Sequence, residues 1–127
     1  ENNIKTYCYD LAWDRMDSEY YIKAVDDAMQ SGFAFDGVFA VDRIAIECMN
    51  RCLKRNRRIP EDVKIVAYDG TFITDIVEPK VTAVVQPIEL LAKEAAKAIT
   101  SLIAGKNPEK MKVVLKASLR KSGTTLV

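Results

Sequence analysis

Short apolar runs alternate along this chain with longer segments in which apolar residues recur every three or four positions. The clearest runs are residues 37–41 (GVFAV), 63–68 (VKIVAY) and 81–85 (VTAVV), and weaker ones lie at 4–9 and 111–119. Largely continuous apolar strands separated by helical segments are typical of parallel strands joined by crossover helices. We therefore predict an α/β fold, a three-layer sandwich with a mainly parallel sheet, in a single domain.

Three segments have the period of an amphipathic helix. The first is expected to be capped by Asp17 or Ser18 and to end near Gln30. The second follows Asp42, which stands in the N-cap position, and it ends in a run of Lys and Arg that suits a solvated helix terminus. The third, over residues 87–104, begins with a proline, which suits the first helical position. Its apolar stripe is Ile88, Leu91, Ala92, Ala95, Ile99, Leu102 and Ile103.

The charges of the chain almost cancel, because 19 Lys and Arg face 18 Asp and Glu among 127 residues. A net charge of +1 offers no strong field to a phosphate backbone, so this segment is not expected to bind nucleic acid. The sequence contains no histidine, which excludes histidine-based catalysis. It has no long apolar span and no signal peptide at its first residues, so we expect a cytoplasmic protein that does not contact the membrane.

The three cysteines, Cys8, Cys48 and Cys52, match no familiar disulfide framework or zinc-site spacing. We expect reduced thiols in the interior. Cys48 and Cys52 lie four residues apart on one helix face and could share a soft metal, but two ligands beside an apolar stripe favour core packing. No metal or cofactor is therefore expected.

Candidate ligand-binding residues follow the predicted strands. If the strands are parallel, their carboxyl ends form one edge of the sheet, and ligands of such folds bind outside that edge. We expect these residues to line one surface. They are Asp10, Trp13, Val41, Asp42, Tyr68, Asp69 and Gln86.

Several of these candidates also have a purely structural interpretation. Asp42 can cap the second helix, Trp13 can be a core residue and Gln86 can cap the third helix. Asp69 follows a buried strand and has no helix directly after it to cap, so we favour a ligand role over an Asx turn. Its carboxylate can accept hydrogen bonds from two adjacent hydroxyls of a small polar ligand.

Three strand-end carboxylates, Asp10, Asp42 and Asp69, also raise an enzyme hypothesis. A phospho-acceptor domain or a Mg²⁺-dependent phosphatase gathers acidic residues at this edge. Such a site needs a paired acidic motif at the first strand and a lysine at a strand end, and neither is present. We therefore expect no catalytic residue.

Three segments together carry a resemblance to a known family. FDGVFAVDRIAIECMNRCLKRNRRIPEDVKIVAYDGT resembles a stretch of the LacI/GalR transcription regulators, in which Asp follows an apolar strand and Val-Pro-Glu-Asp-Val and Tyr/Phe-Asp come later. VTAVVQPIELLAKEAAKAITSLIAGK is similar to the family's strand, Gln-Pro pair and long helix. VVLKASLRKSGTT matches its closing strand. The order is collinear over residues 35–125.

The resemblance implies a set of effector-binding residues. Asp69 matches the family's ligand-contacting Asp, and Gln86 lies beside the cleft where the chain crosses between two lobes. Trp13 approximates an aromatic residue that stacks on a sugar, and Asp42 belongs to the same pocket edge. Val41 departs from the family, because it occupies the position of a polar residue, often Asn, that commonly contacts the effector.

The function implied by the resemblance is effector sensing within a LacI/GalR-type regulator, with a small, sugar-like molecule as ligand. In this family an N-terminal headpiece binds operator DNA, and the chain corresponds to the C-terminal lobe without that headpiece, the hinge and most of the first lobe. A periplasmic-type solute-binding protein is the alternative. Residues 87–104 belong to the first lobe in the family, so this helix must fold back onto its own sheet or pack against a second copy. We favour a symmetric homodimer.

Overall fold

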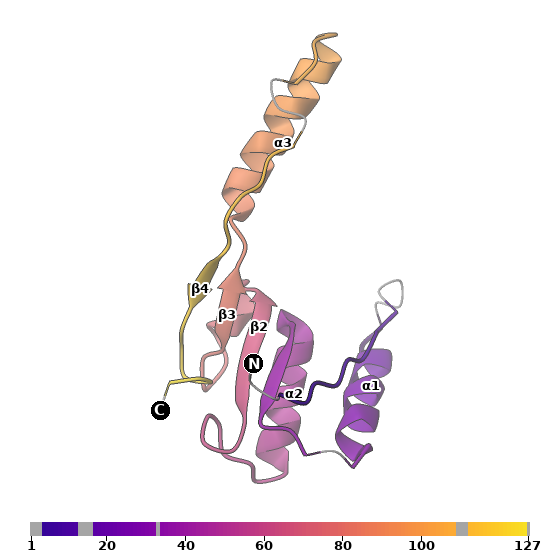
Figure 1. Cartoon of the computed structure of the whole chain (residues 1–127), viewed down its shortest axis with the longest axis vertical. Coiled ribbons are helices and arrows are strands. Elements are labelled where there is room, and N and C mark those ends of the chain that lie inside the picture. Colours follow the sequence, from indigo (N-terminus) through magenta and orange to yellow (C-terminus); the bar gives the residue numbers. More distant parts are fainter. Residues whose placement is uncertain (1–3, 13–16, 33, 109–111, 127) are drawn as a thin grey trace.

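The computed structural model describes residues 4–12, 17–32, 34–108 and 112–126 (Figure 1). A body of sheet and helices occupies one end of the molecule, and one long helix projects from it (Figure 1). In chain order the elements are α1 (Ser18–Gln30), β1 (Gly37–Val41), α2 (Asp42–Lys54), β2 (Lys64–Asp69), the 3₁₀ helix η1 (Phe72–Thr74), β3 (Thr82–Val85), α3 (Ile88–Ile103) and β4 (Ser118–Arg120).

The strands form one sheet in the order β1-β2-β3-β4. β1 pairs with β2 and β2 with β3 in parallel, whereas β4 runs antiparallel to β3. This arrangement confirms the predicted α/β class with a mainly parallel sheet. The parallel register sets Val41 opposite Tyr68 and Asp69 opposite Val85, so the carboxyl ends of three strands meet at one edge.

Helix α2 covers one face of β1 and β2 and closes the hydrophobic core. Its buried face includes Met49 and Cys52, and the burial of Cys52 agrees with the core packing expected for that cysteine. The residues opposite come from β2, β3 and the positions just before them. The fully enclosed core consists of Ala45, Met49, Cys52, Val63, Ile65, Ala67, Val81 and Ala83.

Helix α1 packs beside α2 and begins where the sequence predicted. Asp17 is its N-cap, and its Oδ1 accepts a hydrogen bond from the backbone N–H of Tyr20 at 2.7 Å. Val25 is buried against the body, and Arg51 of α2 donates from Nε to Oδ1 of Asp26 at 2.7 Å. This partly buried ion pair links the two helices and supplements the apolar contact.

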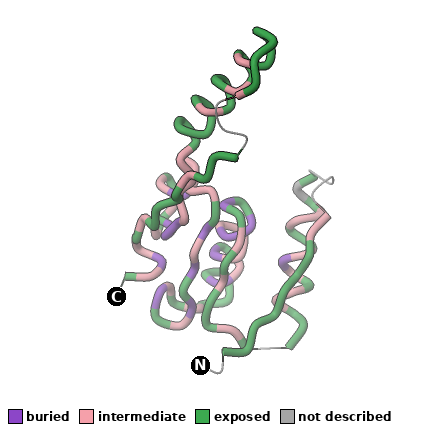
Figure 2. Tube along the Cα trace, turned by 45° about the horizontal axis from the view of Figure 1, so that its top comes forward, coloured by how far each residue is buried: buried purple, intermediate pink, exposed green. Residues whose placement is uncertain are grey.

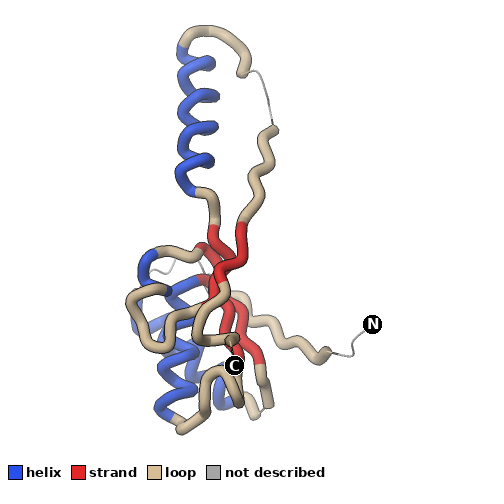
Figure 3. The backbone as a smooth tube through the Cα atoms, turned by 90° about the vertical axis from the view of Figure 1, so that its left-hand side faces the viewer, coloured by secondary structure: helices blue, strands red, loops and turns tan. Residues whose placement is uncertain are grey.

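The face of the sheet that α2 does not cover carries exposed aromatic residues. The Phe39 side chain is 66% exposed, and its ring meets that of Tyr68 edge to face with centroids 6.1 Å apart. Val41 lies on this same side of β1, two residues further on, and is also exposed. The helices of the body lie on the opposite side (Figure 3).

A projecting arm leaves the body at the end of β3. We call α3 together with residues 104–108 and 112–117 the arm. None of the residues of α3 is buried, and most of them are exposed, with half-buried positions only at Glu94, Ala98 and Ser101 (Figure 2). Residues 112–117 return beside the helix without forming a strand (Figures 1 and 3). Within the described residues, the helix therefore does not fold back onto its own sheet.

Two predicted strands are wrong in extent. The segment 4–9 is extended and exposed but lies outside the sheet, and the strand predicted at 111–119 is confined to Ser118–Arg120. A strand needs a neighbour to satisfy its backbone N–H and C=O groups, and neither 4–9 nor 112–117 has a strand beside it in the described structure. Met111 lies outside the described residues.

Three smaller expectations also need correction. Cys8 is exposed rather than interior, whereas Cys48 is half-buried and Cys52 is buried. Pro87 occupies the N-cap position of α3, and Ile88 is the first helical residue. Asp42 is the first residue of α2 rather than its N-cap.

Among the described residues, no helix is long and apolar enough to cross a membrane.

Candidate functional site

The candidate site lies at the carboxyl edge of the parallel strands, where the arm leaves the body. An open pocket of about 430 Å³ is formed there by the ends of β2 and β3 and the first turn of α3. Asp69 and Gly70 come from β2 and the turn after it, and Val85 and Gln86 come from the end of β3. The remaining wall is residues 87–90, so the pocket spans the junction between body and arm.

Asp69 and Gln86 are joined by two hydrogen bonds. Gln86 Nε2 donates to Oδ1 of Asp69 at 2.5 Å, and the backbone N–H of Gln86 donates to the carbonyl oxygen of Asp69 at 3.2 Å. Both residues are half-buried. Among the described residues, no hydrogen bond is made to the second oxygen, Oδ2, so the carboxylate of this pocket-lining residue retains acceptor capacity.

The backbone of Asp69 has an unusual conformation, with φ at 112°. A non-glycine residue in this region costs about 1–3 kcal/mol and persists only where its surroundings enforce it. No side-chain bond from Asp69 to the following backbone is present among the described residues, so the structure does not contain the Asx turn considered as the alternative. The strain coincides with the pocket, as is common at ligand sites.

Gly70 is one reason why Asp69 keeps its positive φ. Its φ is 68°, and a Cβ atom added there would lie 2.7 Å from Cγ2 and 2.9 Å from Cα of Val85. Only glycine allows both the left-handed conformation and this close approach of the β2–η1 turn to β3. The packing of Gly70 on Val85 therefore sets the distance between Asp69 and Gln86.

The carboxylate of Asp42 binds the same turn. Oδ1 accepts a hydrogen bond from the N–H of Gly70 at 3.0 Å, and Oδ2 accepts from the N–H of Thr71 at 2.6 Å and from its Oγ1 at 2.7 Å. Asp42 is 4% exposed, and no side-chain cap bond is found at the start of α2. The prediction that Asp42 caps α2 is therefore wrong, because its two oxygens satisfy donors of the neighbouring turn instead.

The other predicted site residues are distributed differently. Val41 ends β1 and is exposed beside Tyr68, on the strand edge but outside the pocket lining. Asp10 is exposed and lies in the segment 4–12, which is outside the sheet, because the predicted first strand is not formed. Trp13 lies outside the described residues. The structure thus brings Asp42, Asp69 and Gln86 together around one turn.

The residues of the enzyme hypothesis do not converge. Asp42 faces the N–H groups of a turn, Asp69 faces Gln86, and Asp10 belongs to a segment outside the sheet. Within the described ranges, no group of three or more His, Cys, Asp or Glu side chains is arranged to hold a metal ion. This geometry does not support a phosphatase-like acidic centre.

Sequence analysis did not identify the roles of Gly70, Thr71 and residues 87–90. The Asp-Gly pair after a strand was a usable signal, since it favours a positive φ at the glycine. The contribution of residues 87–90 to the pocket depends on how the arm leaves the body, which periodicity does not reveal.

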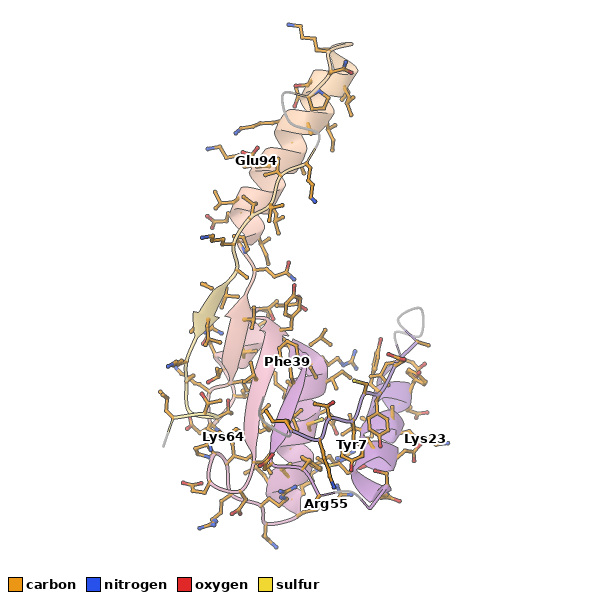
Figure 4. The ribbon with its side chains drawn as sticks, viewed as in Figure 1. Tyr7, Lys23, Phe39, Arg55, Lys64 and Glu94 are labelled. Atoms are coloured by element: carbon orange, nitrogen blue, oxygen red, sulfur yellow. The ribbon has the colours of Figure 1, made fainter. Side chains whose placement is uncertain are left out.

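The basic run at the end of α2 lies away from the pocket. Arg55 and Lys64 are at the end of the body opposite α3, which carries Glu94 (Figure 4). Arg57 donates to the carbonyl oxygen of Phe35 at 2.7 Å and stacks on its ring, and Arg58 pairs with Asp62 at 2.6 Å. These cations stabilise the loop from α2 to β2 and do not contribute to the candidate site.

Comparisons with known proteins agree with this architecture. A profile of the periplasmic binding protein-like domain matches residues 1–125, and the chain belongs to that family. The resemblance to LacI/GalR regulators is confirmed by the proteins whose sequences are similar to that of the chain. The chain is 36% identical over 91 residues to the HTH-type transcriptional regulator CelR of Thermobifida fusca, covering 69% of this chain and 27% of that regulator. It is 34% identical over 71 residues to the ribose operon repressor of Bacillus subtilis, covering 55% of this chain and 22% of the repressor.

Solved structures give the same result. A complex of the transcriptional regulator CelR with cellobiose superposes with a TM-score of 0.76 at 29% identity, over 84% of this chain and 33% of that one. A dimeric Lac repressor superposes with a TM-score of 0.74 at 24% identity, over 84% of this chain and 40% of the repressor, which shows a shared fold. The chain thus spans about a quarter of the length of the curated relatives above.

Proposed function

We propose that this chain is the C-terminal lobe of the effector-binding domain in a LacI-type transcription regulator, and that its pocket binds a small polyhydroxylated effector. The observation that carries the proposal is Asp69, a strained strand-end carboxylate held by Gln86 at the pocket wall. A carboxylate oriented in this way can accept hydrogen bonds from adjacent sugar hydroxyls. The similar CelR structure contains cellobiose, which supports a carbohydrate or a related metabolite as the class of ligand.

In this proposal the chain binds its ligand without transforming it. The relatives above are transcription regulators, and among the described residues no group of three or more His, Cys, Asp or Glu side chains is arranged to hold a metal ion. Effector binding would shift the equilibrium between lobe arrangements, and a DNA-binding headpiece elsewhere in the polypeptide would respond to that shift. Such a regulator acts in the cytoplasm, where its operator DNA is located.

The test is Asp69→Asn in the intact regulator. Isothermal titration calorimetry with a panel of neutral mono- and disaccharides, cellobiose included, first identifies a sugar that binds the wild type. The variant keeps the shape of the side chain and an oxygen for Gln86 but loses the charge, so affinity should fall by about 1–3 kcal/mol if the carboxylate bonds ligand hydroxyls. Asp27→Asn, on the exposed side of α1, is the matched control and should change nothing. Equal affinity of wild type and Asp69→Asn would remove Asp69 from the site.

The arm also supports the assignment of residues 87–104 to a different lobe from the body. Its apolar residues are exposed over the whole helix, and Ile103 is 81% exposed. The chain exposes 9545 Å² in total, roughly 2,800 Å² more than expected for a compact protein of its mass. Apolar residues exposed along a whole helix require a cover, either a neighbouring lobe or a second copy of the chain.

We propose that the 127-residue chain on its own covers this surface by forming a symmetric homodimer. The excess area on each chain is large enough to supply an obligate interface, and self-pairing requires no change in topology. Sedimentation equilibrium at micromolar concentration should give twice the chain mass of 14.2 kDa. A monomer at that concentration, with the amides of α3 protected from hydrogen exchange, would show that the arm folds back instead.

A further inference from the structure

Asp42 has an unusual position for the first residue of a helix. Its carboxylate is directed away from the first turn of α2 and toward the turn that follows β2, where three donors from Gly70 and Thr71 converge on it. Among the buried residues of the described chain, Asp42 is the only charged one. A buried carboxylate is stable only when its oxygens are well satisfied, and here the N–H groups of two successive residues supply this role.

The turn that Asp42 binds is the one that carries Asp69. Asp69 and Gly70 have φ values of 112° and 68°, so two successive residues adopt positive φ. On one side of the turn, Gln86 binds Asp69 through its side chain and its backbone. On the other side, Asp42 binds the two N–H groups that come directly after Asp69.

We propose that Asp42 is a positioning residue for the effector site. It holds the turn at Gly70 and Thr71 and thereby keeps Asp69 in its strained conformation, with the carboxylate against Gln86 at the pocket. Asp42 does not line the pocket and acts on the ligand only through Asp69. This role replaces the direct effector contact expected for Asp42 from the sequence, and it rests on the proposed function of Asp69.

The first experiment examines the turn without any ligand, by NMR of the 127-residue chain. Asp42→Asn keeps the size of the side chain but places an NH₂ donor where two backbone donors converge, so at least one of the three hydrogen bonds is lost. The amide protons of Gly70 and Thr71 should move upfield and exchange roughly tenfold faster or more, and the backbone carbon shifts of Asp69 should move toward ordinary strand values. Unchanged shifts at Asp69 would overturn the proposal.

The second experiment is a double-mutant cycle in the intact regulator, with the sugar that binds the wild type. Asp42→Asn alone should weaken binding about tenfold, but it should have little effect in the Asp69→Asn background, because its influence passes through Asp69. A general loss of stability would instead give additive losses, and additivity would overturn the proposal. If Asp42→Asn does not fold, Thr71→Val replaces it, since this variant removes only the hydroxyl bond and should give a smaller coupled loss.

The two experiments separate this inference from the proposed function. If Asp69→Asn leaves sugar binding unchanged, the proposed function of Asp69 fails, and the NMR experiment still decides whether Asp42 holds the turn. If Asp69→Asn weakens binding and Asp42→Asn does not, the proposed function stands and the positioning role of Asp42 is refuted.

Discussion

Replacing Gly70 with alanine tests whether the turn after β2 is fixed by close packing as well as by its backbone conformation. The substitution adds one methyl group, whose carbon would lie 2.7 Å from Cγ2 and 2.9 Å from Cα of Val85. The first contact involves the end of a side chain, but the second involves backbone, which cannot rotate away. The turn or strand β3 must therefore shift.

Two effects contribute to the expected destabilisation. A left-handed φ costs alanine about 1–2 kcal/mol, part of which is offset by about 0.4–1 kcal/mol because alanine restricts the unfolded chain. Overpacking adds about 1–3 kcal/mol. Gly70→Ala should thus lower the free energy of unfolding by about 2–4 kcal/mol. Gly32→Ala is the matched control, because Gly32 has a φ of 81° and nothing within 4 Å of the added atom, so only the conformational cost applies.

Urea denaturation followed by circular dichroism measures both variants in the same chain. A second comparison uses Val85→Ala, which removes Cγ2 but leaves Cα in place, so it should relieve the destabilisation by Gly70→Ala only in part. If Gly70→Ala and Gly32→Ala cost the same, the contact with Val85 has no energetic consequence, and the packing argument for the position of Asp69 is refuted.

Three further predictions concern other parts of the chain. Burial raises the pKa of the Cys48 thiol to about 12 and also raises the pKa of Cys52, so a thiol reagent should label only Cys8 rapidly in the folded chain, and rapid labelling of a second thiol would contradict this. Hydrogen bonds from Arg58 lower the pKa of Asp62 from its ordinary value of 3.8 to about 2, so this pair stabilises the fold above that range and the contribution is lost as the pH falls through it. Asp62→Asn should therefore reduce the pH dependence of unfolding between 3.8 and about 2, and an unaltered pH profile would contradict the pairing. A gel shift at physiological salt should show no sequence-selective DNA retention by these 127 residues, since a net charge of +1 offers little attraction to phosphates.

Local sequence patterns correctly predicted the helices and strands that pair or pack with other segments of this same chain. The apolar runs at 37–41, 63–68 and 81–85 became β1, β2 and β3 with shifts of one residue at most, because these strands pair with one another. Helix α1 begins at its predicted cap, since capping depends on residues within one turn. The family was likewise visible in the order of its motifs, and the match over residues 1–125 confirms it.

The candidate site was predictable only at the level of the sheet edge. Parallel strands bring Asp69 and Gln86 to neighbouring strand ends, so their proximity followed from topology. The partner of Asp42 did not follow, because its hydrogen bonds reach residues 28 and 29 positions away and a helix cap was the simpler local explanation. The positive φ of Asp69 could not be predicted from the sequence either, since strain of this kind depends on contacts from both sides of a turn.

The two segments that were predicted as strands but stay unpaired have a common cause. Residues 4–9 and 112–117 both have sequences that suit an extended strand, but alternation of apolar residues shows only that a segment can pair, and the pairing itself requires a partner. β1 occupies the end of the sheet order, so its outer edge is open, and 112–117 follows the arm rather than the body. The unpaired segments, the ring of Phe39 and the apolar residues of the arm are therefore the surfaces that stay uncovered within the described residues. The site at Asp69 lies at the base of that arm, so a neighbouring lobe or second copy that covers the arm, as proposed above, would also determine how far the pocket is closed.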